Sequence, residues 1–418
     1  MQLAKIKMTS KVSISAAVDT PLAGRVVLIV VENLPLPFDR RVWQEANALT
    51  AAGASVHIIS PTGKGFEQPY ELIDNIHIYR HKLVEGNGVL GYAREYASAL
   101  FHELRLAIKV YKKAKFDTLH ACNPPDLIFL VALPFKLLGV KFIFDHHDLN
   151  PELFVAKFGK KGFFWNLMVF FEKMTFRAAD VSIATNESYK KIAVERGGMQ
   201  PSDVFVVRSG PDLRKVKVVP INNSWKNGRS FLIGYVGVIG AQEGIDLLLQ
   251  AVHDIVHVKK RRDIQFCIVG GGPAIPDVKL LASELDILDF VQFTGRVSDA
   301  DLFEVLSTSD VCVNPDRVNE MNDKSTMNKI LEYMAFSKPI VQFDVTEGKF
   351  SAGPSSLYAK PNNTADFADK ILYLIDNPDV GRQMGDLGRR RVEDELNWDR
   401  QIAPLINAYV SATATKGN

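Results

Sequence analysis

The sequence predicts an α/β protein with two domains, each built around a doubly wound, mostly parallel β-sheet. Short runs rich in β-branched residues alternate with helical segments along almost the whole chain, which is typical of βαβ units. At 418 residues, the chain is also longer than one ordinary hydrophobic core supports. A polar segment containing Pro, Asn and Gly, residues 220–230, separates two series of such elements.

The first series predicts an N-terminal Rossmann-like domain over residues 24–219. Residues 1–23 lack the apolar core of a signal peptide, so we expect a loose leader there. Helices are expected at about residues 40–52, 92–114, 125–138, 163–178 and 187–197, between strands with the sequences RVVLIVV, SVHIIS, IHIYR, DTLHA, VKFIFD, VSIAT and VFVVR.

The second series predicts a C-terminal Rossmann-like domain over residues 230–397. Its strands are expected at FLIGYVG, IQFCIVG, FVQFTG, DVCVN and PIVQF. Doubly wound sheets bind ligands beyond the carboxyl ends of their strands. We therefore expect the two domains to face each other across a cleft, with the functional residues in loops that follow strands.

The composition indicates a globular protein of a reducing compartment. Hydrophobic residues make up 47% of the chain and charged residues 23%, and no apolar run is as long as a membrane span. Three cysteines, Cys122, Cys267 and Cys312, lie far apart in strand-like runs, without zinc-site spacing. These features predict buried free thiols and a cytoplasmic location.

Charge is distributed unevenly along the chain. Residues 1–215 contain 28 Lys and Arg against 21 Asp and Glu, a net charge of +7, whereas the remainder has 22 against 27, a net charge of −5. A basic front half suggests an anionic partner, such as a membrane surface or a phosphate-bearing substrate; chance asymmetry is the alternative. A concentrated basic run with interleaved aromatic residues, as nucleic-acid binding would require, is lacking.

Three predicted strands of the second series end in glycine-containing loops. Gly237 and Gly240 follow the first, Gly270, Gly271 and Gly272 the second, and Arg296 and Val297 lie in a similar loop, QFTGRV. Such loops let backbone N–H groups approach a phosphate or a sugar. They are also ordinary strand-to-helix connectors, and neither glycine-rich loop fits the dinucleotide fingerprint.

The loop FDHHDLNPEL follows a predicted strand and offers two histidines, His146 and His147, beside carboxylates. Contact with a polar substrate or a structural hydrogen bond are the main alternatives for both. The spacing is cramped for a metal site, and a third ligand is not evident.

The segment KFGKKGFFWNLMVFFEKMTFR predicts a basic and aromatic helix. Asn166, Lys173 and Arg177 fall on one side, leaving a broad apolar face, and Lys157, Lys160 and Lys161 precede the helix. This helix could lie in the headgroup region of an anionic membrane. Packing between the sheet and its neighbours is the alternative.

The segment STMNKILEYMAFSKPIVQFD, residues 325–344, predicts an amphipathic helix followed by a buried strand. At about 100° per residue, Ser325, Lys329 and Glu332 fall on one side. Met327, Ile330, Leu331 and Met334 form the opposite, apolar side. The polar side must therefore point toward solvent or toward a ligand.

Several motifs in this order resemble the retaining, nucleotide-sugar-dependent glycosyltransferases of family 4. They are FDRRVWQEANALTAAGASVHII, VRSGPDL, YVGVIGAQEGIDLLLQA, IVGGGP, VQFTGRV, ADLFEVLSTSDVCVNP and LEYMAFSKPIV, and together they span Arg25 to about Tyr409. The resemblance implies the GT-B architecture of two Rossmann-like domains. It also implies that the terminal helix, within residues 398–418, crosses back and completes the N-terminal domain.

The resemblance assigns the second domain to the sugar donor and the first to the acceptor. It implies that Glu332 hydrogen-bonds the nucleotide ribose, that the turn at Ser325, Thr326 and Met327 cradles the diphosphate, and that His146 or His147 lies near the reacting sugar. Without a metal cofactor, helix amides and Lys or Arg must stabilise the leaving diphosphate.

The sequence departs from the family pattern at three positions. Lys324 stands where a second glutamate is common, and Val238 and Glu243 stand where an arginine and a lysine usually follow the loop glycine. Our hypothesis is that Lys324 or Lys329 supplies the missing positive charge.

The predicted function is transfer of a sugar from a nucleotide donor to a saccharide or lipid-linked acceptor, with retention of configuration, in surface polysaccharide assembly. Peripheral association with the inner face of the cell membrane would fit a lipid-linked acceptor. Two alternatives are a catalytically silent binding protein, which the departures at Lys324, Val238 and Glu243 favour, and a nucleotide-sugar epimerase.

Overall fold

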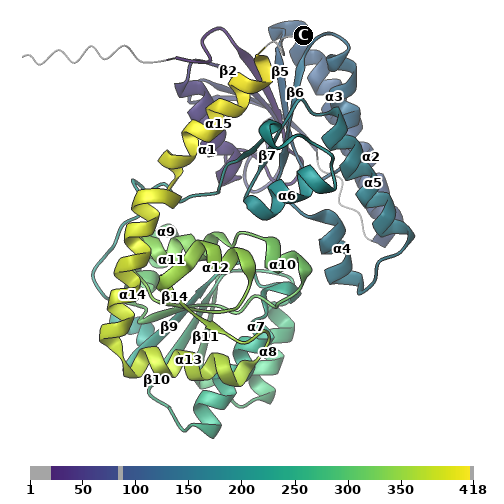
Figure 1. Cartoon of the computed structure of the whole chain (residues 1–418). Coiled ribbons are helices and arrows are strands. Elements are labelled where there is room, and N and C mark those ends of the chain that lie inside the picture. Colours follow the sequence, from purple (N-terminus) through teal and green to yellow (C-terminus); the bar gives the residue numbers. More distant parts are fainter. Residues whose placement is uncertain (1–19, 83–87, 415–418) are drawn as a thin grey trace, which may run out of the picture.

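The computed structural model of the chain describes residues 20–82 and 88–414 and contains two α/β domains, one above the other in Figure 1. Each domain is built around one sheet with helices on both faces. The predicted α/β fold with two doubly wound sheets is confirmed.

The N-terminal sheet has eight strands in the order β3-β4-β2-β1-β5-β6-β7-β8. All neighbouring strands are parallel except β3 and β4, which form an antiparallel pair at one edge. The strands are β1 (Val26–Val30), β2 (Ser55–Pro61), β3 (Tyr70–Ile73), β4 (Ile76–His81), β5 (Thr118–Cys122), β6 (Lys141–His146), β7 (Val181–Ala184) and β8 (Val204–Val206).

Two separate apolar cores cover the faces of this sheet. Residues of α1 and of the C-terminal helix α15 pack on one face, and residues of α2, α3, α5 and α6 pack on the other. The helices are α1 (Arg40–Ala51), α2 (Gly88–Ala114), α3 (Phe129–Lys136), α4 (Asn150–Phe158), α5 (Phe163–Ala178), α6 (Glu187–Glu195) and α15 (Trp398–Thr413).

The C-terminal sheet has six parallel strands in the order β11-β10-β9-β12-β13-β14. Helices α7, α8 and α13 pack on one face, and α9, α11 and α12 on the other. The elements are β9 (Phe231–Val236), α7 (Ile245–His253), β10 (Ile264–Val269), α8 (Ile275–Glu284), β11 (Val291–Gly295), α9 (Asp299–Thr308), β12 (Val311–Asn314), α10 (Glu320–Lys324), α11 (Asn328–Ala335), β13 (Ile340–Phe343), α12 (Thr346–Ala352), β14 (Ser356–Ala359), α13 (Thr364–Asp376) and α14 (Pro378–Arg391).

The ends of the chain differ in how they join the N-terminal domain. Residues 1–19 of the expected leader lie outside the described residues, but Leu22 is buried and its N–H donates to Ala52 O, so the ordered domain already includes it. The C-terminal helix runs from the lower domain to the upper one (Figure 1), and its Leu405, Ala408 and Tyr409 are buried against the N-terminal sheet.

The carboxyl ends of the two sheets face each other. Helices α9, α10 and α12, which follow β11, β12 and β13, carry Asp299, Lys324 and Glu347, and these residues contact Arg40, Asn186 and Ser188 of the N-terminal domain. The domain boundary is therefore the place where side chains from both sheets meet.

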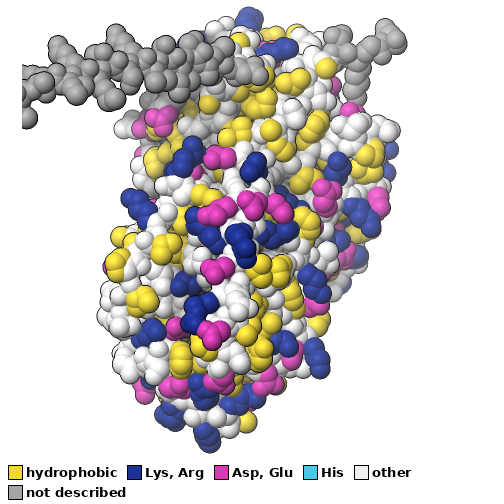
Figure 2. All heavy atoms as spheres, turned by 60° about the vertical axis from the view of Figure 1, so that its left-hand side comes forward, with side chains coloured by type: hydrophobic (Ala, Val, Ile, Leu, Met, Phe, Trp, Pro, Cys, Tyr) yellow, Lys and Arg dark blue, Asp and Glu magenta, His cyan; other side chains and the backbone are white. Residues whose placement is uncertain are grey.

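The three cysteines are free and buried, as predicted. Among the helices formed by residues 20–82 and 88–414, none is both long and apolar enough to cross a lipid bilayer. Figure 2 brings the side of α14 and α15 forward and shows cationic and anionic side chains interspersed there, without a large area of one sign.

Candidate active site at the domain boundary

Three strand-end loops of the C-terminal domain are joined by backbone hydrogen bonds into one layer. The N–H of Gly237 donates to Val269 O (3.0 Å), that of Ile239 to Gly271 O (3.0 Å) and that of Gly270 to Gly295 O (2.9 Å). The loops after β9, β10 and β11 thus form one continuous rim facing the N-terminal domain.

Loop packing explains why most of these positions are glycine. A Cβ at Gly270, where φ is 140°, would lie 1.7 Å from Gly237 O, and one at Gly272 would lie 2.3 Å from Ile239 O. At Gly237 and Gly240 it would approach Tyr235 and Glu243. A Cβ at Gly271 meets nothing within 4 Å. Only Gly271, of the three consecutive glycines, therefore faces space that a ligand can use.

Helix α11 confirms the predicted amphipathic arrangement but begins at Asn328 rather than at Ser325. Ile330, Leu331 and Met334 are buried, and the N–H of Val236 donates to the hydroxyl of Tyr333 (2.8 Å), which ties α11 to β9. Met327 occupies the N-cap position and provides no side-chain hydrogen bond. The first N–H groups of α11 therefore lack the side-chain cap that Asp39 gives to α1.

The N-terminal domain holds the extended segment before α11. Asn186 Nδ2 donates to Lys324 O (2.8 Å) and to Thr326 Oγ1 (3.0 Å). The Ser325 hydroxyl donates to Met321 O (2.8 Å). The predicted cradle at residues 325–327 is thus an interdomain contact whose side-chain hydroxyls already have partners.

Lys329 lies among acidic groups. Its Nζ is 2.8 Å from Asp316 Oδ1 and 5.0 Å from the centre of the Tyr235 ring. Asp316 is almost fully buried; burial raises the pKa of its carboxyl, and Lys329 partly offsets this. Burial, and then the charge of Asp316, raise the pKa of Glu243 as well. The ammonium therefore sits next to one buried carboxylate and near a second.

The carboxylate of Glu332 lies near a guanidinium group of the N-terminal domain. Arg40, at the start of α1, places its guanidinium 3.7 Å from the Glu332 carboxylate and 3.4 Å from that of Asp299. Burial raises the pKa of Glu332, and the charge of Arg40 partly offsets this. A second exposed arginine, Arg296, stacks on the ring of Phe38 across the same boundary (4.6 Å), whereas Val297 packs with neighbouring apolar side chains.

Lys324 lies further along this boundary. Its Nζ is 3.0 Å from Glu320 and 3.7 Å from Glu152 of the N-terminal domain. Lys161, just before α5, also contacts Glu320 (3.1 Å). Both lysines in our charge-replacement hypothesis are thus paired with carboxylates in this structure.

The two histidines at the end of β6 point to opposite faces of the sheet. His146 is fully buried among the rings of Phe144, Phe176 and Tyr189, with its Nε2 3.3 Å from Glu172. Its assignment to the reacting sugar is therefore wrong in this structure, because β6 turns every second side chain into the apolar core.

His147 is partly exposed at the carboxyl end of the sheet and is held by charged neighbours. Its Nε2 lies 2.6 Å from Asp145 Oδ2 and 2.9 Å from Arg41 Nε, and its backbone N–H donates to Asn123 Oδ1 (2.7 Å). Of the two predicted histidines, only His147 is placed where it can meet a substrate.

Beneath His147 lies a buried polar network that the motifs did not predict. Arg41 contacts both Asp145 and Glu45 at 3.1 Å, and Tyr409 of α15 meets His120 Nδ1 at 2.6 Å. Its sequence signal was the position of Glu45 on the apolar face of α1, beside Val42 and Ala46.

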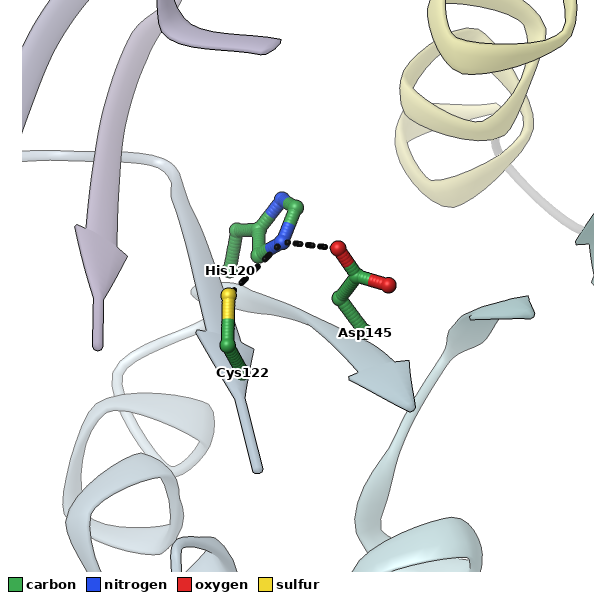
Figure 3. A group of neighbouring side chains, drawn as sticks. All are labelled: His120, Cys122 and Asp145. Carbon is green, nitrogen blue, oxygen red and sulfur yellow. Dashed lines mark hydrogen bonds and ion pairs between the residues drawn. The ribbon is translucent and has the colours of Figure 1, made fainter. Parts of the chain in front are cut away.

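Three members of this network, His120, Cys122 and Asp145, point toward one another (Figure 3). They do not suit a metal ion. Arg41 already supplies a cation to Asp145; burial raises the pKa of this carboxyl, but Arg41 and His147 outweigh that effect and hold the pKa well below its usual range. Burial also raises the pKa of the Cys122 thiol, so the thiolate that binds metals is disfavoured.

Comparison with known proteins shows which fold and which family of sequences the two domains resemble. Two family sequence models match, Glycosyltransferase Family 4 over residues 39–215 and Glycosyl transferases group 1 over residues 230–377. A sucrose-phosphate synthase from Thermosynechococcus elongatus superposes with a TM-score of 0.77 at 18% identity, covering 92% of this chain and 98% of that one. The fold is therefore GT-B, as the resemblance implied.

Curated relatives agree with the family models. An uncharacterized glycosyltransferase of Haemophilus influenzae is 26% identical over 84% of this chain and 89% of its own length. The alpha-D-kanosaminyltransferase of Streptomyces kanamyceticus is 29% identical over 37% of this chain, but the match spans only 39% of that relative. The chain belongs to glycosyltransferase family 4.

Proposed function

We propose that the protein transfers a sugar from a nucleotide-sugar donor to a saccharide or lipid-linked acceptor, with retention of anomeric configuration and without a metal ion. Surface polysaccharide assembly is the setting that we propose. The observation that carries this proposal is that Lys329 and Glu332 both lie on α11, whose N-terminus has no side-chain cap and adjoins the loop of Gly237.

In the proposed reaction, α11 would have to stabilise the leaving nucleoside diphosphate. Cleavage of the sugar–diphosphate bond develops negative charge on the phosphates, which preorganised N–H groups and cations stabilise. The uncapped N-terminus of α11 offers such N–H groups and the positive end of the helix dipole. Lys329 lies one residue inside it, and a diphosphate would compete with Asp316 for its ammonium.

Glu332 lies one turn further along α11, where its carboxylate can accept hydrogen bonds from the two hydroxyls of a ribose. Arg40 occupies that carboxylate in the present structure, with most of its own side chain exposed. At 3.7 Å and with Arg40 mostly exposed, the pair holds Arg40 only loosely, so a nucleotide can displace Arg40 at low cost. His147 is our candidate for the sugar side of the site. In a retaining reaction the leaving phosphate itself would accept the proton of the incoming hydroxyl on the same face.

One observation favours the alternative of a silent nucleotide-binding protein. Asp316 and Glu243 place two carboxylates around the single ammonium of Lys329, which opposes a diphosphate unless at least one of them is protonated or moves. Turnover rather than binding therefore decides between the two functions.

The test is release of nucleoside diphosphate from a panel of nucleotide sugars, with oligosaccharide and lipid-linked acceptors, in the presence of magnesium or a chelator. We expect acceptor-dependent release from one donor that survives chelation, and a product anomer identical to that of the donor by NMR. Binding without release would support the silent protein. An isomerised nucleotide sugar formed without acceptor would support the epimerase.

A further inference from the structure

Helix α3 is apolar on the side that faces solvent as well as on the side that faces the core. Phe129, Val131, Ala132 and Phe135 are buried against the sheet, whereas Leu130 and Leu133 are exposed, as are Leu137 (88%) and Leu138 of the turn that ends the helix. A helix on the surface of a globular protein normally turns polar residues outward. The outward side of α3 is therefore unusual and calls for a partner.

The helices on both sides of α3 continue this apolar surface. Helices α2 and α5 each pack against α3 (Figure 1). Phe163, Phe164 and Phe170 of α5 are exposed, Phe163 by 75%, as are Phe101 and Ile108 of α2. We call the exposed side of α2, α3 and α5 the outer helical face.

The outer helical face is also positively charged. Within residues 97–178, all seven Asp and Glu side chains are buried or half-buried, whereas nine Lys and Arg side chains are exposed. Four of these cations, Arg105, Lys109, Lys112 and Lys113, lie around Ile108 on the exposed surface of α2. The described part of this stretch thus offers apolar and cationic groups to a partner and no exposed carboxylate.

We propose that the outer helical face docks on the surface of a bilayer that contains anionic phospholipids. Phe and Leu side chains would enter the boundary between headgroups and acyl chains, while Lys and Arg would meet the lipid phosphates. A protein partner that buried the same face would have to cover all three helices with an apolar surface rimmed by acidic residues; a bilayer supplies both features without specific shape.

The outer helical face lies close to the candidate active site at the domain boundary. Lys161 precedes α5 at the edge of the outer helical face, and its contact with Glu320 lies at the domain boundary beside Lys324. An acceptor held in the membrane would therefore meet the protein next to the candidate active site. Docking is a property of the surface alone and stands independently of the proposed transfer reaction.

The first test is co-sedimentation of the full chain with vesicles. We expect binding to vesicles of phosphatidylcholine with about 30% phosphatidylglycerol, and little binding to phosphatidylcholine alone. Raising the salt concentration from about 0.05 M to about 0.5 M should weaken binding at least tenfold, because exposed charges are screened over a shorter distance. Absence of binding to the anionic vesicles at low salt, or equal binding to both compositions, would overturn the proposal.

Paired variants locate the surface. Leu137→Glu/Leu138→Glu and Lys109→Glu/Lys112→Glu change exposed positions, and each should reduce binding to anionic vesicles at least tenfold. The matched control, Lys279→Glu/Leu280→Glu, changes an equally exposed Lys and Leu on α8 and should bind like wild type. A loss in the control equal to that in the paired variants would overturn the assignment. So would a wild-type dimer in sedimentation that Leu137→Glu/Leu138→Glu dissociates, because a second copy would then cover the face.

Discussion

The ammonium of Lys329 lies 2.8 Å from the buried carboxylate of Asp316, at the second residue of a helix whose N-terminus has no side-chain cap. The pair gives Lys329 a fixed position before any ligand arrives. It also means that a bound diphosphate must take over part of a hydrogen bond that the folded protein already makes.

Replacement of Lys329 by alanine should weaken binding of the preferred nucleoside diphosphate about tenfold to a hundredfold, because a charge-assisted hydrogen bond to phosphate is lost. Calorimetric titration measures this effect. Lys349→Ala is the control, since Lys349 of α12 also pairs with an aspartate (2.7 Å) and lies over a tyrosine ring (5.3 Å), but on the exposed surface. Equal affinities for the two variants would exclude Lys329 as a phosphate ligand.

Variants of Gly270 and Gly271 distinguish a glycine that loop packing requires from one that faces the proposed ligand. Gly270→Ala should lower the free energy of unfolding by about 1–3 kcal/mol, because its φ of 140° and the carbonyl of Gly237 leave no room for a Cβ. Gly271→Ala should leave stability unchanged but weaken nucleotide binding, since its Cβ would enter open space at the rim. Urea unfolding and titration of both variants check this. Unchanged affinity in Gly271→Ala would place the ligand elsewhere.

The buried network under His147 should be more important for stability than any surface ion pair. Asp145→Asn removes the charge between Arg41 and two histidines and should cost about 3 kcal/mol or more in urea unfolding. Asp344→Asn breaks an exposed pair with Lys349 and should cost less than about 1 kcal/mol. Similar losses for both variants would show that the network contributes no more than a surface contact.

The buried carboxyl group of Glu103 should make the free energy of unfolding depend on pH. It is fully buried in α2, and burial raises the pKa of its carboxyl from 4.5 to about 8. Between these values the folded protein holds one proton more than the unfolded chain, so the free energy of unfolding should fall as the pH rises from about 5 to about 8.

Thermal unfolding of Glu103→Gln checks this dependence. The variant should be more stable than wild type near pH 8, by a few kcal/mol at most, and the difference should shrink toward pH 5. Glu284→Gln, on the exposed side of α8, is the control and should follow wild type throughout. A constant difference between Glu103→Gln and wild type across this range would contradict a buried, protonated Glu103.

Alternation of strands and helices predicted most of both sheets. Two edge strands, β3 and β14, were not predicted because their sequences, YELI and SLYA, contain no run of β-branched residues, and β3 is only partly buried. The sequence pattern predicts a loop where helix α4 begins, since the first turn of α4 contains Asn150 and Pro151. Short elements whose stability comes from tertiary contacts carry little local signal.

The sequence predicted the polar side of α11 in the candidate site, but neither the extended segment before that helix nor the burial of His146. Residues 325–327 are extended because Asn186, from the other domain, holds the segment, and no local pattern reports such a contact. The burial of His146 could have been inferred. In β6, a period of two places it on the same side as Phe142 and Phe144, which belong to the aromatic core.

Thermal unfolding tests most directly whether α11 binds a nucleoside diphosphate. Wild type and Lys329→Ala would be heated with UDP, GDP, ADP, dTDP or CMP, without metal and then with magnesium. A ligand at 100 times its dissociation constant adds about 2.7 kcal/mol, which raises the midpoint by a few degrees. We predict such a shift for wild type with one diphosphate, independent of magnesium, and a much smaller shift for Lys329→Ala. No shift with any nucleotide, or the same shift in both proteins, would contradict the assignment.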